Sequence, residues 1–320
     1  MGLWQDRVTL ELAGYHKYST DVLMNVSTPA STGFTNFWDN VGTILNRGVE
    51  FSIKSRNLTG DLQWNTDLNI ARNYNELINI GNYTPDAVSG GTNDSRVIVG
   101  RPVGSFYLVE HSHVDPETGL PVYLDLDGNE TYEYSNDIRK YVGDGLPDVI
   151  GGMNNTFRYK NWDLSGLATF SIGAKIFDSS AKRQLGVVTG WNMREEKLDR
   201  WRQPGDEATY PRLTLDETTY SLPSGFPWWN TSLFIYDASY IRLRNVTLGF
   251  TVPLPPGSTM SACRIALNAT NLLTITNFPG LDPEVVRDFE NAQDRNMSPN
   301  VTYLTPPQER AITLSISTTF

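Results

Sequence analysis

The last ten residues, Ala311-Ile312-Thr313-Leu314-Ser315-Ile316-Ser317-Thr318-Thr319-Phe320, decide the fold class. Ile and Leu alternate here with Thr and Ser, which is the two-residue period of a β-strand with two unlike faces. The segment then ends on an aromatic residue, Phe320. One face of the predicted strand is therefore hydrophobic, and the other is polar.

Seven further segments follow the same rule. They are rich in Thr, Asn, Ser and aromatic residues, and Gly and Pro separate them, as in an all-β chain. These predicted strands are residues 8–12, 49–54, 60–73, 153–159, 162–172, 239–251 and 262–273. In the 239–251 segment Leu243 has one parity and Val246, Leu248 and Phe250 have the other, which predicts a bulge or a face change near Asn245.

The predicted connections alternate in length. The long ones are residues 19–42, 74–150, 177–236 and 274–309, and the short ones are residues 57–60, 160–162 and 253–261. Outer-membrane β-barrels have this asymmetry, with short periplasmic turns and long external loops. Two apolar patches, 97–109 and 120–134, predict one more hairpin of the sheet. A soluble β-sandwich is the alternative, but it would need very long structureless loops.

Composition narrows the class of protein. The 320 residues are 39% hydrophobic and 19% charged, and no run of about 18 apolar residues predicts a transmembrane helix. The net charge of −10 disfavours nucleic acid as a partner. The single cysteine, Cys263, cannot form an internal disulfide. No signal peptide is expected in this chain, because residues 1–7 lack a basic segment followed by an apolar one.

Four stretches carry a resemblance to a known family. They are Asn46-Arg47-Gly48-Val49-Glu50, Tyr240-Ile241-Arg242-Leu243-Arg244-Asn245-Val246-Thr247-Leu248-Gly249-Phe250, Ala269-Thr270-Asn271-Leu272 and Pro279-Gly280-Leu281-Asp282-Pro283-Glu284. Over nearly its whole length the chain resembles the C-terminal portion of the SusC/RagA-like TonB-dependent outer-membrane transporters. The resemblance implies an all-β fold, part of an antiparallel transmembrane β-barrel of 22 strands with long extracellular loops.

The resemblance also implies a function and partners. Residues 1–320 would be the C-terminal part of the barrel, with the plug domain and the N-terminal strands absent. The function would be TonB-dependent import of glycan or peptide across the cell outer membrane. The implied partners are a SusD-like surface lipoprotein, the TonB complex through the missing N-terminal part, outer-membrane lipid and the barrel-assembly machinery. A solitary part of a barrel would leave two open edges, whose unpaired backbone groups are costly in lipid.

Aromatic residues supply the candidate site residues. The terminal Phe320 is the candidate assembly signal. Trp4, Trp64 and Trp162 lie near predicted strand ends, as an interfacial girdle requires. Four tryptophans of a long external loop are candidates for stacking on sugar rings, although packing of the loop on itself is favoured. They are Trp191, Trp201, Trp228 and Trp229.

Metal binding and catalysis find little support. The turn 125–130 resembles a calcium loop but lacks the Glu at its twelfth position, so a solvated acidic turn is favoured. His111 and His113 should face one way on a strand, with no third ligand indicated. Neither a metal nor a cofactor is expected. The pair Glu195 and Glu196 lies in a helix-like charged stretch, 194–201, that we expect to be solvated.

No carboxylate pair, Ser-His-Asp set or nucleophile elbow stands out, so we expect no enzyme. Three hypotheses are kept in order. The first is a part of a transporter barrel, and the second is a soluble or surface-attached β-sandwich that binds glycan or protein. The third is a glycan-cleaving β-enzyme.

Overall fold

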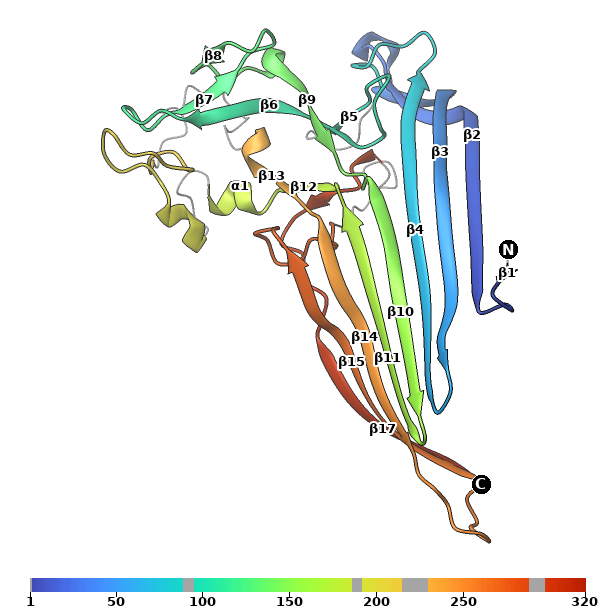
Figure 1. Cartoon of the computed structure of the whole chain (residues 1–320). Coiled ribbons are helices and arrows are strands. Elements are labelled where there is room, and N and C mark those ends of the chain that lie inside the picture. Colours follow the sequence, from blue (N-terminus) through green and yellow to red (C-terminus); the bar gives the residue numbers. More distant parts are fainter. Residues whose placement is uncertain (1, 89–94, 186–191, 215–229, 288–296) are drawn as a thin grey trace.

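A computed structural model of the chain describes residues 2–88, 95–185, 192–214, 230–287 and 297–320. Its main element is a tall, curved sheet, hereafter the wall (Figure 1). The strands of the wall, in chain order, are β1 (Gly2–Leu3), β2 (Val8–Ser27), β3 (Asn36–Thr59), β4 (Leu62–Asn79), β10 (Val149–Tyr159), β11 (Trp162–Ile172), β14 (Tyr240–Thr251), β15 (Ala262–Thr276) and β17 (Ala311–Thr319).

These nine strands lie side by side in chain order, and every pair of neighbours is antiparallel. All eight predicted strands are therefore confirmed, and β1 is a short addition. The sheet is open, because β1 and β17 are its edges and no pairing between them occurs among the described residues. Such an open, twisted sheet is the geometry of a sector of a barrel.

The prediction of a long loop at residues 19–42 is wrong. Strands β2 and β3 stay paired through most of it, down to Ser27 opposite Asn36, with register shifts on either side of Val22. Asp21, beside the shift, has a positive φ of 54°. Continued pairing satisfies backbone donors and acceptors that a loop would leave to water, so this hairpin simply extends beyond the rest of the wall.

The two rims of the wall differ as predicted. The short connections 60–61, 160–161 and 252–261 lie at its lower end in Figure 1, and the long ones 80–148, 173–239 and 277–310 lie at the upper end. The C-terminus lies at the lower end, where the Ser261 N–H donates to the Thr319 carbonyl. The loop asymmetry of a membrane barrel is therefore present.

One face of the wall is hydrophobic and uncovered. On the last strand Ile312, Leu314 and Ile316 are 68%, 68% and 65% exposed, and Leu12 on β2 is 80% exposed. In a β-sandwich the same side chains would be buried against a second sheet. No described segment covers this face, which we call the outer face, so the sandwich alternative does not describe the fold.

Aromatic residues mark the lower limit of the outer face. Trp64 stacks on Phe157 with 5.5 Å between ring centroids, and Trp162 lies 4.7 Å from Phe250. Ten residues further along β4 is Tyr74, about 33 Å away along an extended strand. At a strand tilt of about 40° this spans roughly 25 Å, the height of the apolar band of outer-membrane barrels.

The long connections fold into a second body, hereafter the rim module (Figure 1). One sheet contains β5 (Ser95–Arg96), β6 (Ser105–Val114), β7 (Pro121–Leu124), β8 (Glu130–Thr131) and β9 (Arg139–Asp144), and a smaller one contains β12 (Lys175–Asp178), β13 (Ile235–Asp237) and β16 (Val301–Thr302). The short helix α1 (Ala181–Gln184) joins them around a buried core that includes Phe106, Tyr123, Phe177 and Phe234.

The hairpin predicted from the patches 97–109 and 120–134 is therefore wrong as part of the wall. Strands β6 and β7 do pair, but in the rim module. Phe106, Leu108 and Val109 are all buried, so β6 is covered on both faces and has no face for lipid. Among the described helices, none is long and apolar enough to cross a membrane.

Candidate functional site

Two of the motifs quoted above meet at the upper part of the wall's polar face. Arg242 of β14 donates from Nη2 to Oδ1 of Asp282, in the 277–310 connection, at 2.5 Å. The side chains are only 2% and 5% exposed. Arg242 Nη1 also lies 3.3 Å from Oε2 of Glu284. A buried charge requires such partners, because removal from water is costly unless it is compensated.

A second arginine of β14 completes the network. Arg244 Nη2 lies 2.8 Å from each carboxylate oxygen of Glu284 and 3.1 Å from the Thr169 hydroxyl, while Nη1 donates to Gln308 Oε1 at 2.9 Å. The Gln308 backbone N–H donates to Asp282 Oδ2 at 3.1 Å. Both ends of the 277–310 connection are therefore tied to the same strand.

The Asp282 carboxyl is adapted to this position. Burial opposes its ionisation, but hydrogen bonds from Arg242 and from the backbone N–H groups of Glu284 and Gln308 outweigh burial and lower its pKa. From the sequence, Asp282 and Glu284 were noted only as members of the Pro279–Glu284 motif, with no role of their own. The matching two-residue spacings of Arg242 and Arg244 and of Asp282 and Glu284 were the available signal.

A β-bulge gives the two arginines their direction. Leu167 of β11 is opposite Asn245, and Ala168 is opposite Leu243, so Arg244 is the extra residue. The bulge keeps Arg242 and Arg244 on the polar face, while Val246 and the apolar residues after it return to the outer face. The bulge predicted near Asn245 is confirmed.

The Ala269–Leu272 motif forms the matching irregularity on β15. Leu243 pairs with Leu273 and Asn245 with Thr270, so Asn271 and Leu272 are left without cross-strand partners. Asn271 has a φ of 50°, a left-handed conformation that Asn adopts more readily than most residues. Its Nδ2 donates to the Glu309 carbonyl at 2.9 Å, which fixes the start of the last strand.

The glycine of the Asn46–Glu50 motif also has a structural cause. Tyr15 of β2 lies over Gly48 on the polar face and donates to Asn73 Oδ1 at 2.7 Å. A Cβ at Gly48 would lie 2.5 Å from the Arg72 carbonyl oxygen and 2.6 Å from the Tyr15 hydroxyl. Any larger residue would displace Tyr15 or the neighbouring backbone.

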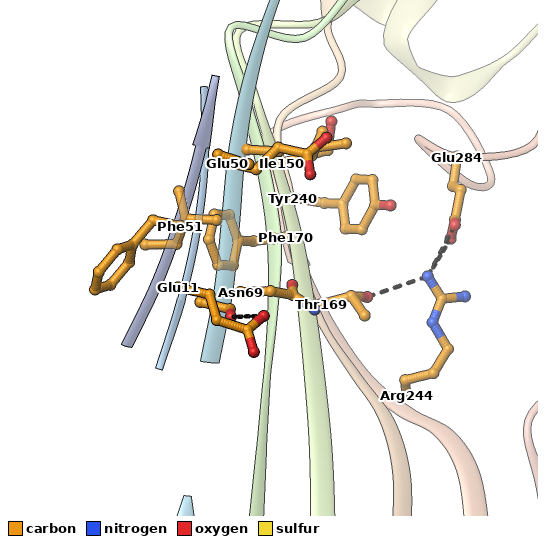
Figure 2. A pocket seen from close by; sticks show the side chains of 16 residues that line it. Glu11, Glu50, Phe51, Asn69, Ile150, Thr169, Phe170, Tyr240, Arg244 and Glu284 are labelled. Carbon is orange, nitrogen blue, oxygen red and sulfur yellow. Dashed lines mark hydrogen bonds and ion pairs between the residues drawn. The ribbon is translucent and has the colours of Figure 1, made fainter. Parts of the chain in front are cut away.

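A cavity of about 590 Å³ lies on the polar face next to the arginine network (Figure 2). Glu11 and Glu50 lie on one side of it, and Tyr240, Arg244 and Glu284 on the other. Asn69 and Thr169 lie between them (Figure 2), and the hydroxyl groups of Ser52 and Ser171 also belong to the lining. A volume of this order is usual for small-ligand sites. The lining suits a polar ligand rich in hydrogen-bonding groups.

Of the four loop tryptophans, the structure describes one, Trp201, and it also describes the predicted assembly signal, Phe320. Trp201 is half-buried, donates from Nε1 to the Pro116 carbonyl at 2.7 Å, and packs its ring where a Cβ of Gly119 would lie. Trp191, Trp228 and Trp229 lie outside the described residues. Phe320 is 84% exposed and follows the last wall strand.

The prediction that His111 and His113 face one way is wrong. A register shift in β6 makes Ser112 an extra residue, so His111 packs against Tyr123 and His113 is exposed near Glu130. Burial, with the nearby His113, lowers the pKa of His111 to about 4. Among the described residues, no His, Cys, Asp and Glu side chains gather in a group of three or more that could hold a metal ion.

In the acidic turn 125–130, the carboxylate of Asp125 is hydrogen-bonded to other residues of the same turn. Asp125 accepts hydrogen bonds from the backbone N–H groups of Asn129 and Asp127 and from the Asn129 amide, which lower its pKa.

The helix-like charged stretch predicted at residues 194–201 contains a 3-10 helix, Glu195–Leu198. Its buried Lys197, which the sequence analysis missed, donates to the Leu185 carbonyl at 2.6 Å, and burial together with the nearby Arg200 lowers its pKa to about 7.

Comparison with known proteins finds relatives of the chain among TonB-dependent receptors. No protein-family model matches the chain. TonB-dependent receptor P3 of Formosa agariphila is 29% identical over 344 aligned residues, covering 100% of this chain and 33% of the receptor. TonB-dependent receptor SusC of Bacteroides thetaiotaomicron is 28% identical over 303, covering 89% and 28%.

The chain is homologous to TonB-dependent receptors. It corresponds to the C-terminal part of these receptors and spans about a third of their length. A solved structure of the RagAB peptide transporter has the same fold, with a TM-score of 0.80 and 22% identity over 98% of this chain and 34% of that one. The predicted resemblance and the partial-barrel fold are therefore confirmed.

Proposed function

We propose that this chain supplies wall and extracellular loops to an outer-membrane, TonB-dependent importer of glycans or peptides. The observation that carries the proposal is the open antiparallel wall, which has one uncovered apolar face and one polar face. An apolar band of about 25 Å above an aromatic girdle fits lipid. The names of the relatives, which are receptors and a peptide transporter, support the same function.

The same proposal covers the rest of the barrel. Residues 1–320 form its C-terminal part, and the plug and the N-terminal strands come from sequence outside this chain. Those strands pair with the two edges of the wall, β1 and β17, because open edges are not stable in lipid. Coupling to the TonB complex runs through that other part, and the last strand with Phe320 is the signal that the barrel-assembly machinery binds.

The upper rim is the site of capture in this proposal. The rim module lies at the end of the wall that carries the long connections, where a SusD-like surface lipoprotein would cover it. The cavity between Glu11, Glu50 and Arg244 offers carboxylate, amide and hydroxyl groups to a polar substrate such as a glycan or a peptide. Trp201 and the other three loop tryptophans, Trp191, Trp228 and Trp229, remain candidates for contact with sugar rings.

Uptake in the native bacterium tests the proposal. We expect deletion of the gene to abolish growth on one class of glycan or peptide, and collapse of the proton-motive force to stop uptake of the labelled substrate. The protein should be found in the outer-membrane fraction and should need detergent for extraction. Recovery of a folded, soluble protein without detergent would contradict the proposal and favour a binding module.

Substitutions in the cavity distinguish an effect on transport from an effect on assembly of the barrel. The double substitution Glu11→Gln and Glu50→Gln removes two charges from the polar face without changing its shape. We expect normal amounts in the outer membrane but uptake reduced by about tenfold, which corresponds to ~1.4 kcal/mol of binding. Arg158→Gln, an exposed change lower on the same face, is the matched control.

A further inference from the structure

Three basic side chains interrupt the outer face of the wall near its upper limit. On β3, Arg47 is opposite His16 of β2 and Tyr74 of β4, so the three form one cross-strand row. Arg72 lies in the next row, opposite Val49, which is itself opposite Gly14. Alternation puts both rows on the face of Leu12 and Phe51, which is the apolar one.

The height of these residues on the wall defines their surroundings. Arg72 and Tyr74 lie eight and ten residues above Trp64, the residue of the lower aromatic girdle. They therefore lie where the apolar band ends and the headgroups of the outer leaflet begin. Arginine is unfavourable at the middle of a membrane but is tolerated at this level, because its head can reach charged groups.

A groove of about 430 Å³ lies at these two rows, and its lining residues are Tyr15, His16, Arg47, Gly48, Val49, Arg72 and Tyr74. The guanidinium of Arg47 lies 4.5 Å from the centroid of the Tyr74 ring, and this stacking restricts its orientation while its N–H edge stays available. Gly14 contributes no side chain to the row of Arg72, so one side of the groove is open.

The groove lacks an acidic partner of its own. Among the described residues no carboxylate lies within 4 Å of the guanidinium of Arg47 or of Arg72, although six other arginines or lysines do form such pairs. The nearest acid along β4 on this face, Glu76, accepts a hydrogen bond from the Tyr74 hydroxyl at 3.1 Å. The missing anion must therefore come from outside the wall.

We infer that Arg47, Arg72 and His16 bind the phosphate of an anionic lipid in the outer leaflet. Phosphate is the anion found at this level of a membrane, and two guanidinium groups can each donate two hydrogen bonds to it. Val49 in the groove, and Leu12 and Phe51 below it, are exposed and can contact the acyl chains of the same molecule. This inference depends on the proposed membrane position of the wall.

The test compares lipid retained by the protein purified from its own outer membrane in mild detergent. The variant is Arg47→Gln with Arg72→Gln, and the control is Arg158→Gln on the polar face. Native mass spectrometry should detect phosphorylated lipid on the wild type and on the control. We expect the double variant to retain at least about tenfold less. Equal retention would overturn the inference, and heat-modified gel mobility shows that each variant is folded.

Added probes identify the source of the phosphate. Delipidated protein receives lipid A with its phosphates, the same lipid after enzymatic dephosphorylation, or inorganic phosphate. We expect binding of the phosphorylated lipid alone. Binding of the dephosphorylated lipid, displacement by inorganic phosphate, or loss of an acidic protein instead of lipid from the double variant would each contradict a lipid-phosphate site. Nutrient uptake by the double variant should stay near the wild-type rate, so this test fails independently of the proposed transport.

Discussion

Arg242 and Asp282 are forty residues apart in the chain, and the hydrogen bond of 2.5 Å between them joins the wall to the 277–310 connection of the upper rim. Both side chains are almost completely buried. The bond holds the 277–310 connection against β14, and through Gln308 it also holds the segment that leads into β17. The last strand therefore begins from a fixed point.

Asp282→Asn should release this connection. The substitution leaves Arg242 buried without its nearest charge, and breaking a buried pair in this way costs about 3–5 kcal/mol. We expect trypsin to cleave the 277–310 connection at least tenfold faster than in the wild type, measured on the protein in outer-membrane vesicles. The wall itself should remain folded.

Asp163→Asn is the matched control. Its partner, Arg264, lies 2.5 Å away, but the two side chains are 41% and 27% exposed, so the pair is worth less than about 1 kcal/mol. Cleavage should stay near the wild-type rate. Equal sensitivity of both variants would show that the buried pair does not hold the connection.

Acid should act on the same contact only at low pH. Because the folded-state pKa of Asp282 is lowered, the carboxylate stabilises the fold above its unfolded pKa near 3.8, and the stabilisation disappears as pH falls through the lower folded value. We expect the connection to be equally protected from proteolysis at pH 7 and pH 5, and to be released only at a pH well below 3.8.

Gly48→Ala should destabilise the wall. The new Cβ would lie 2.5 Å from a backbone oxygen and would displace the Tyr15 hydroxyl from Asn73, so we expect a loss of about 1–3 kcal/mol in the free energy of unfolding. Denaturant titration in detergent micelles measures it. Gly166→Ala, on β11, meets nothing within 4 Å and should change stability by less than about 0.5 kcal/mol.

Asn271 should tolerate glycine better than a branched residue. At a φ of 50° Asn271→Gly carries no steric cost, whereas Asn271→Val should cost about 1–2 kcal/mol. Both variants lose the hydrogen bond to Glu309, so only the conformational effect differs between them. Similar unfolding midpoints for the two variants would contradict this explanation of the Ala269–Leu272 motif.

The rim module should weaken on mild acidification. His111 has a folded-state pKa of about 4 against 6.5 in water, so the unfolded module binds the proton more readily. Stability is complete above pH 6.5 and falls as pH decreases toward 4, by at most about 3 kcal/mol. The protection factors of the β6 amides, which are corrected for the pH dependence of intrinsic exchange, should fall between pH 7 and pH 5. His111→Gln should abolish this change, whereas His113→Gln should leave it intact because His113 is exposed.

The wall was predictable because its two environments differ sharply. In the proposed membrane position, lipid on one side and a polar interior on the other impose a strict two-residue period, so eight strands and the bulge near Asn245 were readable from single segments. The length of the β2–β3 hairpin beyond residue 19 was underestimated. Outside the membrane both faces of a strand meet water, so the two-residue period of apolar and polar residues is not maintained there.

The rim module was not predictable in the same way. Strand β6 is buried on both faces, and its bulge at Ser112 reverses the direction of a histidine, so counting residues gave the wrong face for His113. The Arg242–Asp282 contact depends on a fold that brings residues forty positions apart together. Charge spacing suggests such a pair but does not identify its partners.

The extra residue at Arg244 has an evolutionary consequence. Deleting Val246, below the bulge, would turn Leu248 and Phe250 toward the interior and send Thr247 into hydrocarbon. We therefore expect insertions and deletions in related proteins to occur in the upper connections, or two residues at a time within a strand of the wall. Divergent relatives should accordingly differ in the lengths of their upper connections, whereas the number of residues in each strand of the wall should stay constant.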